Sequence, residues 1–486
     1  MTDWNLSLIS PIMPEIFLSA MALLLVMVGA LKGDKSMGFV TYGVIASFVL
    51  AGGILYSVSD TRPFDTLNGM LVVNGFSNVM RGLILTGMVF SSLLSLNWLR
   101  QNNFMKFEFP LLYLFSAIGL LFMVSSNHFL ALYVALELSS LSLYVLAAIK
   151  RDHLDSTEAG LKYFILGALS SGLLLFGISL IYGYTGSLNF SEVNAALVSA
   201  QMLPVGAIIG MVFILAGLVF KISAVPFHMW TPDVYQGAPT PVTAFFAIVP
   251  KIAAFALIIR LMTGPFAILN DQFIQIIIFV SVASMVVGAF AGLLQSNFKR
   301  LLAYSSIANM GFALLGLLYN VPEGVGSVIL YLAIYMVMTA GVFGILMSIQ
   351  RRGVALEKIE DFAGFAQYSP LLAYSLAVLL FSMSGIPPMA GFFAKFFVFQ
   401  AAVGAGYFNV AVVGVLASVV AAYYYLRVIK LMIFDKPNSD MAFTPMCQFS
   451  QLIVIVASVA AVILFTFMPN QVMHQALEAA QSLFPQ

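Results

Sequence analysis

Long runs of apolar residues, separated by short polar segments, extend along almost the whole chain. A helix needs about 20 apolar residues to cross a bilayer, and about fourteen of the runs suit such a crossing. The pattern therefore predicts an all-α membrane protein with about fourteen transmembrane helices. The expected spans are 11–31, 37–58, 76–97, 108–124, 125–149, 157–184, 203–235, 240–263, 272–296, 299–319, 324–350, 366–400, 406–434 and 450–470.

Composition agrees with this fold class. Hydrophobic residues make up 61% of the sequence and charged residues only 8%, whereas soluble domains carry roughly 25% charge. The single cysteine, Cys447, excludes an internal disulfide and an iron–sulfur cluster held by this chain alone. The net charge of +1 gives no reason to expect nucleic acid as a partner. The four histidines have no metal-site spacing, and no glycine-rich nucleotide-binding motif is present.

The distribution of lysine and arginine predicts the orientation of the spans. When the N-terminus is placed outside and the spans alternate, fourteen of the 21 basic residues fall in cytoplasmic loops and one, Arg62, falls outside. This bias follows the positive-inside rule, so we expect both termini on the outer side. Six basic residues remain within the spans: Arg81, Lys162, Lys221, Lys251, Arg260 and Lys395.

Charges within the spans indicate function, because a lysine at the bilayer centre costs roughly 2.5–3.5 kcal/mol. Lys251 lies about eleven residues from either end of its span, so its side chain cannot easily reach the interface. Arg81 and Arg260 lie near span ends, and we expect both to extend towards water. Lys162 lies about one and a half turns inside its helix, and its position suits a functional and a structural role equally.

Glu137 is the one acidic residue deep within a span. Tyr133, Ser140 and Tyr144 stand at i−4, i+3 and i+7 from it, so the four share one face of a helix. The glutamate is either protonated and simply packed, or paired with a lysine of a neighbouring helix. Pairing favours the charged forms and burial favours the neutral ones, so a group held between the two effects exchanges protons readily.

Two spans carry helix-breaking residues beside a lysine, in opposite order. Pro226 should break the helix near residues 223–226, about one turn after Lys221. Gly385 and the prolines at 387–388 should break the other helix, about two turns before Lys395. Interrupted helices in corresponding positions of two halves are typical of inverted-repeat transporters. The sequence thus predicts two inverted five-helix repeats, each with one broken helix.

This prediction divides the chain into four parts. We expect three leading transmembrane helices in 1–107, the first repeat in 108–265, the second repeat in 266–437 and a final helix in 438–486.

Two further polar sites accompany the breaks. His228 and Asp233 follow the first break, and His228 suits a proton relay or a hydrogen bond to the broken backbone. Tyr304, Ser305 and Ser306 form a polar cluster in the tenth span. The cluster could hold water or pack helices together, and the sequence does not decide between these roles.

The residues together predict an ion or proton translocator. Glu137, Lys162, Lys221, Lys251 and Lys395 form a series of titratable groups at middle depth in both repeats, and protons can pass between such groups through water. The chain carries no nucleophile–base arrangement, metal site or cofactor motif of its own. Its energy must come from an ion gradient or from another subunit.

Several segments resemble the proton-translocating, antiporter-like membrane subunits of respiratory complex I, the bacterial NADH–quinone oxidoreductase. They are LVFKISAVPFHMWTPDVYQGAPTPVTAFFAIVPKIAAFALIIR, YVALELSSLSLYVL, LKYFILGALSSG, NFKRLLAYSSIANMG and SGIPPMAGFFAKF. The resemblance covers spans four to thirteen. At position 395 the chain has lysine. In this it resembles one branch of the family, whereas another branch bears glutamate there.

The resemblance implies roles for individual residues. Glu137 matches a glutamate of the family, and Lys221 matches the lysine that pairs with it. Lys251 matches the central lysine of the eighth span, and Lys395 matches the residue that the family uses to release the proton outward. Lys162 fits an additional lysine. The resemblance also implies an inner-membrane subunit with other membrane subunits on both sides, indirect contact with the peripheral redox arm, and a lipid bilayer around it. NADH, FMN, iron–sulfur clusters and quinone would be bound by partner subunits.

Three alternatives remain open. The chain could belong to a multisubunit cation/proton antiporter or to a membrane-bound hydrogenase. It could also be a structural membrane subunit with an inactive channel. The coupled ion could be sodium, although fixed lysine charges favour the proton.

Overall fold

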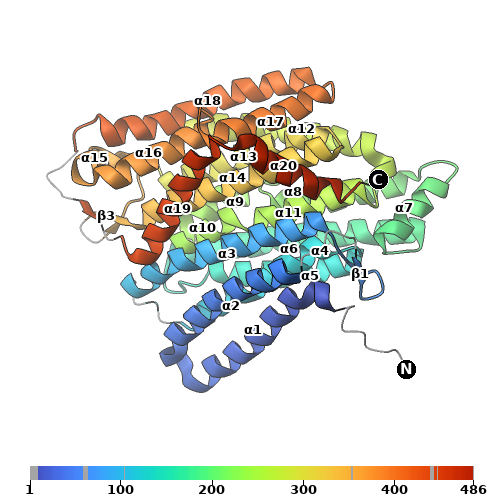
Figure 1. The fold of residues 1–486 in the computed structure, drawn as a ribbon, viewed down its shortest axis with the longest axis horizontal. Helices are drawn as coiled ribbons and strands as arrows, with labels where there is room; N and C mark the ends of the chain where they lie inside the picture. The colour runs from blue at the N-terminus through green and yellow to red at the C-terminus, as the bar shows by residue number, and fades with distance from the viewer. Residues whose placement is uncertain are drawn as a thin grey trace.

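The computed structural model describes residues 9–58, 64–102, 104, 106–351, 354–437, 443–445 and 447–484; Arg62 lies outside them. This part of the chain is mostly helical (Figure 1). Ten of its helices are long and apolar enough to cross a membrane, or eleven when one strongly bent pair is counted as a span. The predicted class, an all-α membrane protein, is therefore confirmed at this level.

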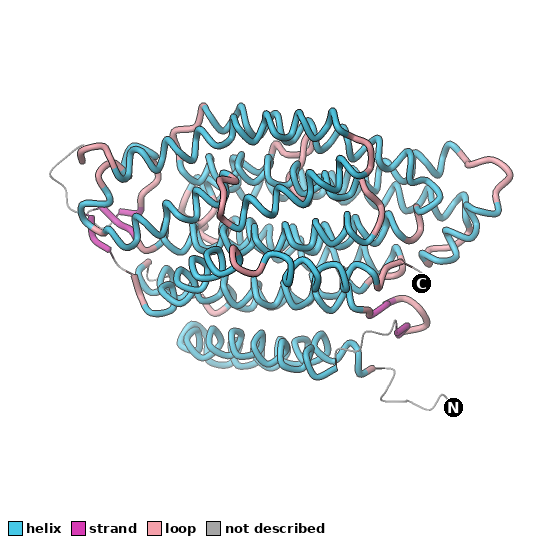
Figure 2. Tube along the Cα trace, turned by 45° about the horizontal axis from the view of Figure 1, so that its top comes forward, coloured by secondary structure: helices cyan, strands magenta, loops and turns pink. Residues whose placement is uncertain are grey.

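The N-terminal part is a helical hairpin packed on a long helix. The hairpin consists of α1 (Met13–Lys32) and α2 (Met37–Val58), joined by a 3-10 turn at Gly33–Ser36. Gly33 ends α1 with a φ of +59°, a conformation that glycine adopts without steric cost. Figure 2 shows the hairpin as a layer at one edge of the molecule, against α3 (Gly75–Gln101) and α4 (Glu108–Ser125).

Two groups of helices follow along the chain. The first continues from α4 with α5 (Phe129–Ala147), α6 (Leu154–Thr185), α7 (Phe190–Ser199), α8 (Val205–Lys221), α9 (Trp230–Gly237), α10 (Thr240–Ile248) and α11 (Pro250–Thr263). The second contains α12 (Asn270–Leu293), α13 (Phe298–Leu315), α14 (Pro322–Met347), α15 (Phe365–Tyr368), α16 (Pro370–Ser384), α17 (Ala390–Gly404) and α18 (Phe408–Ile433). The chain then forms α19 (Phe449–Phe465) and α20 (Pro469–Gln481), which are bent by 98° relative to each other.

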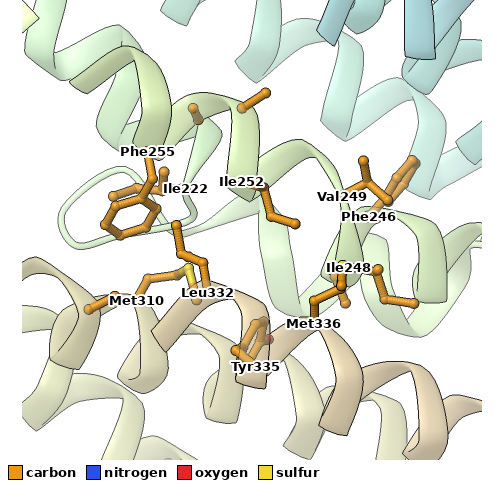
Figure 3. Close-up of a cluster of buried hydrophobic side chains, with 14 of the residues drawn as sticks. Ile222, Phe246, Ile248, Val249, Ile252, Phe255, Met310, Leu332, Tyr335 and Met336 are labelled. Carbon is orange, nitrogen blue, oxygen red and sulfur yellow. The ribbon is translucent and has the colours of Figure 1, made fainter. Parts of the chain in front are cut away.

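The two groups meet around a central core. The most apolar window of the α10–α11 segment is 94% buried, as is that of α13, whereas the windows of α6 and α18 are only 39% buried. Figure 3 shows part of this core, where Ile248 and Ile252 face Leu332 and Met336 of α14. Polar groups carried by α11, α13 and α14 are therefore enclosed by protein, while α6 and α18 expose apolar side chains outward.

Two small sheets in the connections were not predicted. β1 (Phe64–Thr66) and β2 (Leu71–Val73) form an antiparallel pair. β3 (Ile349–Arg351) pairs on both sides, with β4 (Val354–Ala355) and with β5 (Phe443–Pro445). The second sheet joins the segment after α14 to the segment before α19, and strands this short leave too little periodicity in the sequence to be recognised.

Candidate functional site

The first broken helix places Lys221 at a helix end. α8 ends at Lys221, and α9 begins only at Trp230 after a series of turns. Ser223 has a φ of +62°, and the peptide bond before Pro226 is cis. The predicted break is therefore confirmed, with Lys221 just before it. The last carbonyl groups of a helix have no partner within the helix, and the negative end of the helix dipole lies there, so this position attracts a cation.

Lys221 reaches across to the polar face of α5. Its Nζ donates to Ser140 Oγ at 2.7 Å and to Tyr144 OH at 3.3 Å, and it lies 5.5 Å from the centre of the Tyr144 ring. These are two of the residues that the spacing had grouped on one face with Glu137. The helix-periodic prediction thus identified the surface of α5 that receives the lysine.

Glu137 lies on the same face but does not touch Lys221. Among the described residues no ion pair within 4.0 Å joins Glu137 to a lysine, and its buried Oε1 atom has no hydrogen-bond partner there. Lys221 therefore contacts two hydroxyl groups of this face and not the Glu137 carboxyl group, with which the resemblance implied that it pairs. The reason is geometric: Ser140 and Tyr144 stand one and two turns further along α5, towards the end of α8 where Lys221 lies.

An open groove leads to this contact. It has a volume of about 940 Å³ and is lined by residues of α4, α5, α6 and the segment between α5 and α6. Lys150 and His153 lie at the segment that joins α5 to α6, and Tyr144 also lines the groove. The hydroxyl that accepts a hydrogen bond from Lys221 is thus carried by a residue that borders an opening to the exterior of the chain.

The second broken helix holds Lys395 against the end of α16. α16 ends at Ser384, and α17 begins at Ala390, which confirms the break predicted from Gly385 and the two prolines. Lys395 is 6% exposed. Its Nζ donates to the Ser384 carbonyl oxygen at 2.9 Å and to Ser418 Oγ of α18 at 2.8 Å. Lys395 therefore reaches back across the break, and both site lysines lie at the C-terminal end of a half-helix.

Lys251 lies in the most buried part of the molecule. It stands in the first turn of α11 and is 1% exposed. Its Nζ donates to Ser306 Oγ, which also accepts a hydrogen bond of 2.7 Å from Tyr335 OH. The span that holds Lys251 is interrupted between Ile248 and Pro250, a break that was not predicted although Pro250 signals it.

Lys162 belongs to a more exposed ionic cluster. Its Nζ lies 2.8 Å from Glu158 Oε1 on the same helix and 2.8 Å from Asp233 Oδ2 on α9. The other oxygen of Asp233 lies 2.6 Å from Arg300 Nη1 on α13. The Lys162 side chain is 42% exposed. The structure thus separates Lys162 from Lys221, Lys251 and Lys395 and gives Asp233 a position between the two helix groups.

His228 lies within the first break, between α8 and α9. Its side chain is partly buried, and its Nδ1 atom is buried without a hydrogen-bond partner among the described residues. A buried ring nitrogen of this kind can bind a water molecule. This placement is compatible with the relay proposed from the sequence.

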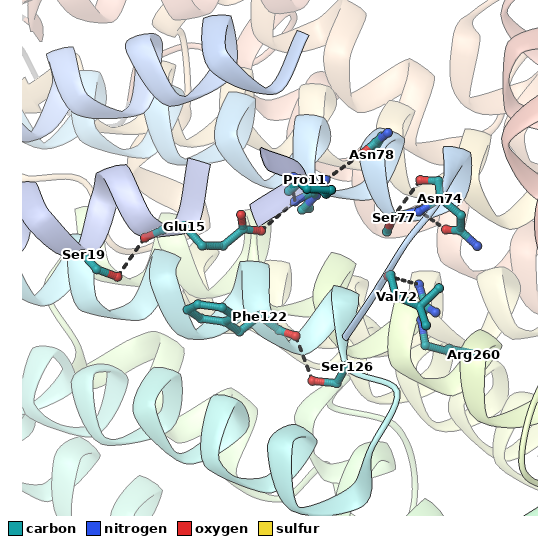
Figure 4. Close-up of polar contacts among 11 residues, drawn as sticks. Pro11, Glu15, Ser19, Val72, Asn74, Ser77, Asn78, Phe122, Ser126 and Arg260 are labelled. Carbon is teal, nitrogen blue, oxygen red and sulfur yellow. Dashed lines mark hydrogen bonds and ion pairs between the residues drawn. The ribbon is translucent and has the colours of Figure 1, made fainter. Parts of the chain in front are cut away.

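The two arginines expected to extend towards water are buried instead. Arg81 is 1% exposed and pairs with Glu15 of α1 at 2.8 Å, and Arg260 is 5% exposed. Figure 4 shows Glu15 beside Pro11, with Arg260 directed at Val72. That expectation was wrong because the N-terminal hairpin covers this end of α3, which no local pattern reveals.

The site as a whole is a set of buried or half-buried amines bound to neutral oxygens. Lys221, Lys251 and Lys395 each contact at least one hydroxyl group. No group of three metal-ligating side chains occurs in the described part of the chain. Of the hydroxyl partners, Ser140 and Ser306 were marked by the sequence, whereas Ser418 carried no signal because it lies in an ordinary apolar helix. Such a set can bind, hold and pass on protons.

Comparisons with known proteins agree with the geometry. Residues 126–421 match the family described as NADH:quinone oxidoreductase/Mrp antiporter, TM. The chain is 48% identical over 98% of its length to NADH-quinone oxidoreductase subunit N of Rhodospirillum rubrum, and 98% of that protein is covered. It is 51% identical to the subunit N of Parvibaculum lavamentivorans, over 88% of both chains.

Solved structures share the fold. A chain of respiratory complex I from Thermus thermophilus matches with a TM-score of 0.81 and 33% identity, covering 95% of this chain and 99% of that one. A chain of the Mrp complex from a Dietzia species matches with a TM-score of 0.85, covering 97% of each chain, but at 21% identity. The second likeness is one of fold alone.

Proposed function

Because the chain belongs to the NADH:quinone oxidoreductase/Mrp antiporter family of membrane proteins, we propose that it is a proton-translocating membrane subunit of a bacterial NADH–quinone oxidoreductase. In this role it couples NADH oxidation and quinone reduction, carried out elsewhere in the complex, to proton movement across the membrane. The chain itself performs no redox chemistry. The identity to relatives named subunit N extends over nearly the entire chain, which supports this assignment over an antiporter subunit.

The observation that carries the proposal is the placement of three lysines that contact neutral oxygens. Lys221 is the last residue of α8, the Lys395 ammonium contacts the carbonyl end of α16, and Lys251 lies in the core. Broken backbone is tolerated at membrane depth where it lines a protein-enclosed or hydrated space. Buried amines that contact only neutral oxygens can take up and release a proton without breaking an ion pair.

Glu137 adds a negative charge on the approach to Lys221. Although the two side chains are not in contact, Glu137 shares a helix face with both hydroxyls that bind Lys221. A charge change at Glu137 therefore alters the proton affinity of the lysine through space. We assign Glu137, Lys221, Lys251 and Lys395 to proton translocation, with His228 as a relay within the first break. We assign Lys162 a peripheral role, in the exposed ionic cluster with Glu158 and Asp233.

The architecture fits two inverted repeats and fourteen crossings. The helical run Ser10–Val58, counted once among the ten spans, is a hairpin and supplies two crossings. The broken pairs α8–α9 and α16–α17 and the helix α19 each supply one more, which brings the ten to fourteen. We propose the repeats 108–265 and 266–437, preceded by three helices in 1–107 and followed by one in 438–486.

The partners follow from the family. We propose that the chain lies in the bacterial inner membrane with both termini on the periplasmic side, between other membrane subunits of the complex. We assign NADH, FMN, the iron–sulfur clusters and quinone to partner subunits of the complex.

The test replaces the buried amines within the assembled complex. Lys221→Met and Lys395→Met should each lower proton pumping in membrane vesicles by at least roughly tenfold, a barrier increase of about 1.4 kcal/mol. Lys430→Met is the matched control, because Lys430 is 69% exposed and pairs with Asp435 at the surface. Normal pumping in both site variants would show that the chain is a structural subunit. Proton movement by the unaltered chain in the absence of NADH and quinone would favour the antiporter alternative.

A further inference from the structure

The face of α13 between Lys251 and Lys395 carries polar residues that the proposed function does not yet use. Ser306 accepts the hydrogen bond of Lys251 at one end of this stretch. At the other end, Lys395 Nζ lies 4.8 Å from the centre of the Phe312 ring. Six residues separate Ser306 from Phe312, which corresponds to a rise of ~9 Å along the helix. Two turns of α13 therefore span the interval between the two lysines.

Asn309 stands in the middle of this interval and is 3% exposed. Its Oδ1 accepts a hydrogen bond of 2.7 Å from Tyr331 OH of α14. Its Nδ2 donates to the Ser305 carbonyl oxygen at 2.8 Å and lies 3.4 Å from Tyr425 OH of α18. One buried amide thus contacts the hydroxyls of two tyrosines from two other helices, and Ser305 Oγ lies 2.5 Å from the Tyr425 hydroxyl.

The cluster adjoins both lysine sites. On α14, Tyr331 stands one turn from Tyr335, whose hydroxyl binds Ser306 beside Lys251. On α18, Tyr425 stands seven residues after Ser418, so the two share a helix face. Ser418 binds Lys395 at 2.8 Å. Each arm of the Asn309 cluster therefore leads to one of the two lysines.

Unpartnered hydroxyls flank the cluster. The hydroxyls of Tyr235, Thr339 and Tyr424 are buried and have no partner in hydrogen-bonding geometry among the described residues. Buried polar groups without a protein partner commonly bind ordered water. The Tyr235 ring also lies near Lys251, because Lys251 Nζ is 5.7 Å from the centre of the Tyr235 ring. Tyr331 and Tyr335 are one turn apart on α14, and Ser418 and Tyr425 are about two turns apart on α18, so water must complete the path between these hydroxyls. Apolar residues enclose the region, including Met310 and Leu332 in Figure 3.

We propose that Asn309 is a positioning residue for proton transfer from Lys251 to Lys395, holding the hydroxyls of Tyr331 and Tyr425 in a hydrated path along α13. This inference rests on the proposed function and adds a positioning residue between the two lysines. A proton leaves the Lys251 ammonium, and each hydroxyl or water on the path accepts one proton and releases another. The proton is received by the neutral amine of Lys395, so every intermediate oxygen ends in its starting protonation state.

A purely structural role is the competing explanation, because the same hydrogen bonds join α13, α14 and α18. The two roles make different predictions. Loss of a structural bond reduces the amount of folded complex, and what remains pumps normally. Loss of a path residue lowers pumping by complexes that are fully assembled.

The experiment compares Asn309→Leu and Tyr425→Phe with Tyr113→Phe in the whole complex reconstituted into vesicles. Tyr113 is the matched control: it is also 1% exposed, and its hydroxyl donates to the Pro241 carbonyl oxygen at 3.0 Å, away from the three lysines. We expect Asn309→Leu and Tyr425→Phe to lower pumping per assembled complex by at least roughly tenfold. Their combination should be no worse than either alone, because both act on one path.

The outcomes separate the Asn309 path from the proposed function. The Asn309 path is overturned if Tyr425→Phe pumps like Tyr113→Phe at equal assembly, and this comparison remains measurable even if Asn309→Leu does not assemble. Lys251→Met is measured in parallel. If Lys251→Met abolishes pumping while Tyr425→Phe does not, only the Asn309 path is wrong; if neither has an effect, the lysine mechanism itself fails.

Discussion

Lys395 donates a hydrogen bond of 2.9 Å to the main-chain carbonyl oxygen of Ser384, the last residue of α16, although eleven residues and a helix break separate them. The ammonium group therefore binds a main-chain carbonyl oxygen at the break between α16 and α17. It occupies the negative end of the preceding half-helix, where unsatisfied carbonyl groups attract a cation. Lys221, as the last residue of α8, occupies the equivalent end of the other broken helix.

Gly385 leaves the space that Lys395 needs to reach the Ser384 carbonyl oxygen. It has a φ of +84°, and a Cβ atom there would lie 2.9 Å from Lys395 Cδ. We expect Gly385→Ala to cost roughly 1–2 kcal/mol in backbone strain and, in addition, to displace the lysine and reduce pumping. Gly406→Ala is the control, because Gly406 has a φ of +86° but open space around it. Equal pumping per assembled complex in the two variants would contradict the prediction.

Gly167 makes room for the partner of Lys221. A Cβ atom at Gly167 would lie 2.1 Å from Tyr144 OH, the hydroxyl that Lys221 binds. Gly167→Ala should therefore move Tyr144 and lower pumping, although alanine is the better helix former by about 1 kcal/mol. Gly172→Ala on the same helix meets no atom within 4 Å and should leave pumping unchanged. Vesicle pumping assays of the two variants decide the matter.

The buried pair Arg81–Glu15 should matter for stability. Both side chains are at most 1% exposed, so Glu15→Gln leaves the Arg81 charge without its partner. Breaking a buried pair in this way costs about 3–5 kcal/mol. We expect a marked loss of thermal stability of the purified complex in detergent. Asp34→Asn, which removes the exposed partner of Lys106, should cost about 1 kcal/mol or less; comparable losses in both variants would argue against a buried pair.

Asp233 should contribute more than Lys162 to the joint between the helix groups. Asp233→Asn weakens contacts to both Lys162 and Arg300, whereas Lys162→Met leaves the Asp233–Arg300 contact of 2.6 Å in place. These groups are about one-third exposed, so we expect effects of about 1 kcal/mol or less. Thermal melting at low and high salt measures them, because salt screens exposed pairs. A larger loss for Lys162→Met would reverse this ranking.

His128 should make the start of α5 sensitive to acid. Its Nδ1 accepts a hydrogen bond from the Leu130 amide, which requires the unprotonated ring. Partial burial lowers the pKa of His128 below its usual 6.5, and Glu192 opposes this shift. The unfolded state thus binds more protons, so the stabilisation is present above pH 6.5 and is lost as the pH falls through the lowered pKa. His128→Asn keeps an acceptor without titrating, and its melting temperature should depend less on pH in that range.

How much could be predicted depended on whether the cause was local. Proline and glycine act on their own helix, so the breaks beside Lys221 and Lys395 were readable from the sequence. The 3.6-residue period placed Ser140 and Tyr144 on one face with Glu137, and low charge established a membrane protein. These features depend on residues within a few turns of one another.

The contacts between distant elements were decided only by tertiary structure. Glu15 and Arg81 are 66 residues apart, Lys251 and Ser306 are 55 apart, and no local pattern specifies that they meet. Packing also placed hydroxyls within hydrogen-bonding distance of Lys221, while no carboxylate of the described residues lies within 4.0 Å of it, and it placed Lys162 in an exposed cluster. The sequence by itself determined which charges lie within apolar spans, but not which of them are buried: Lys162 is exposed, whereas Arg81 and Arg260 are covered by other elements. Which atoms receive those charges follows from how the helices pack, since each buried donor must find its acceptor on another helix.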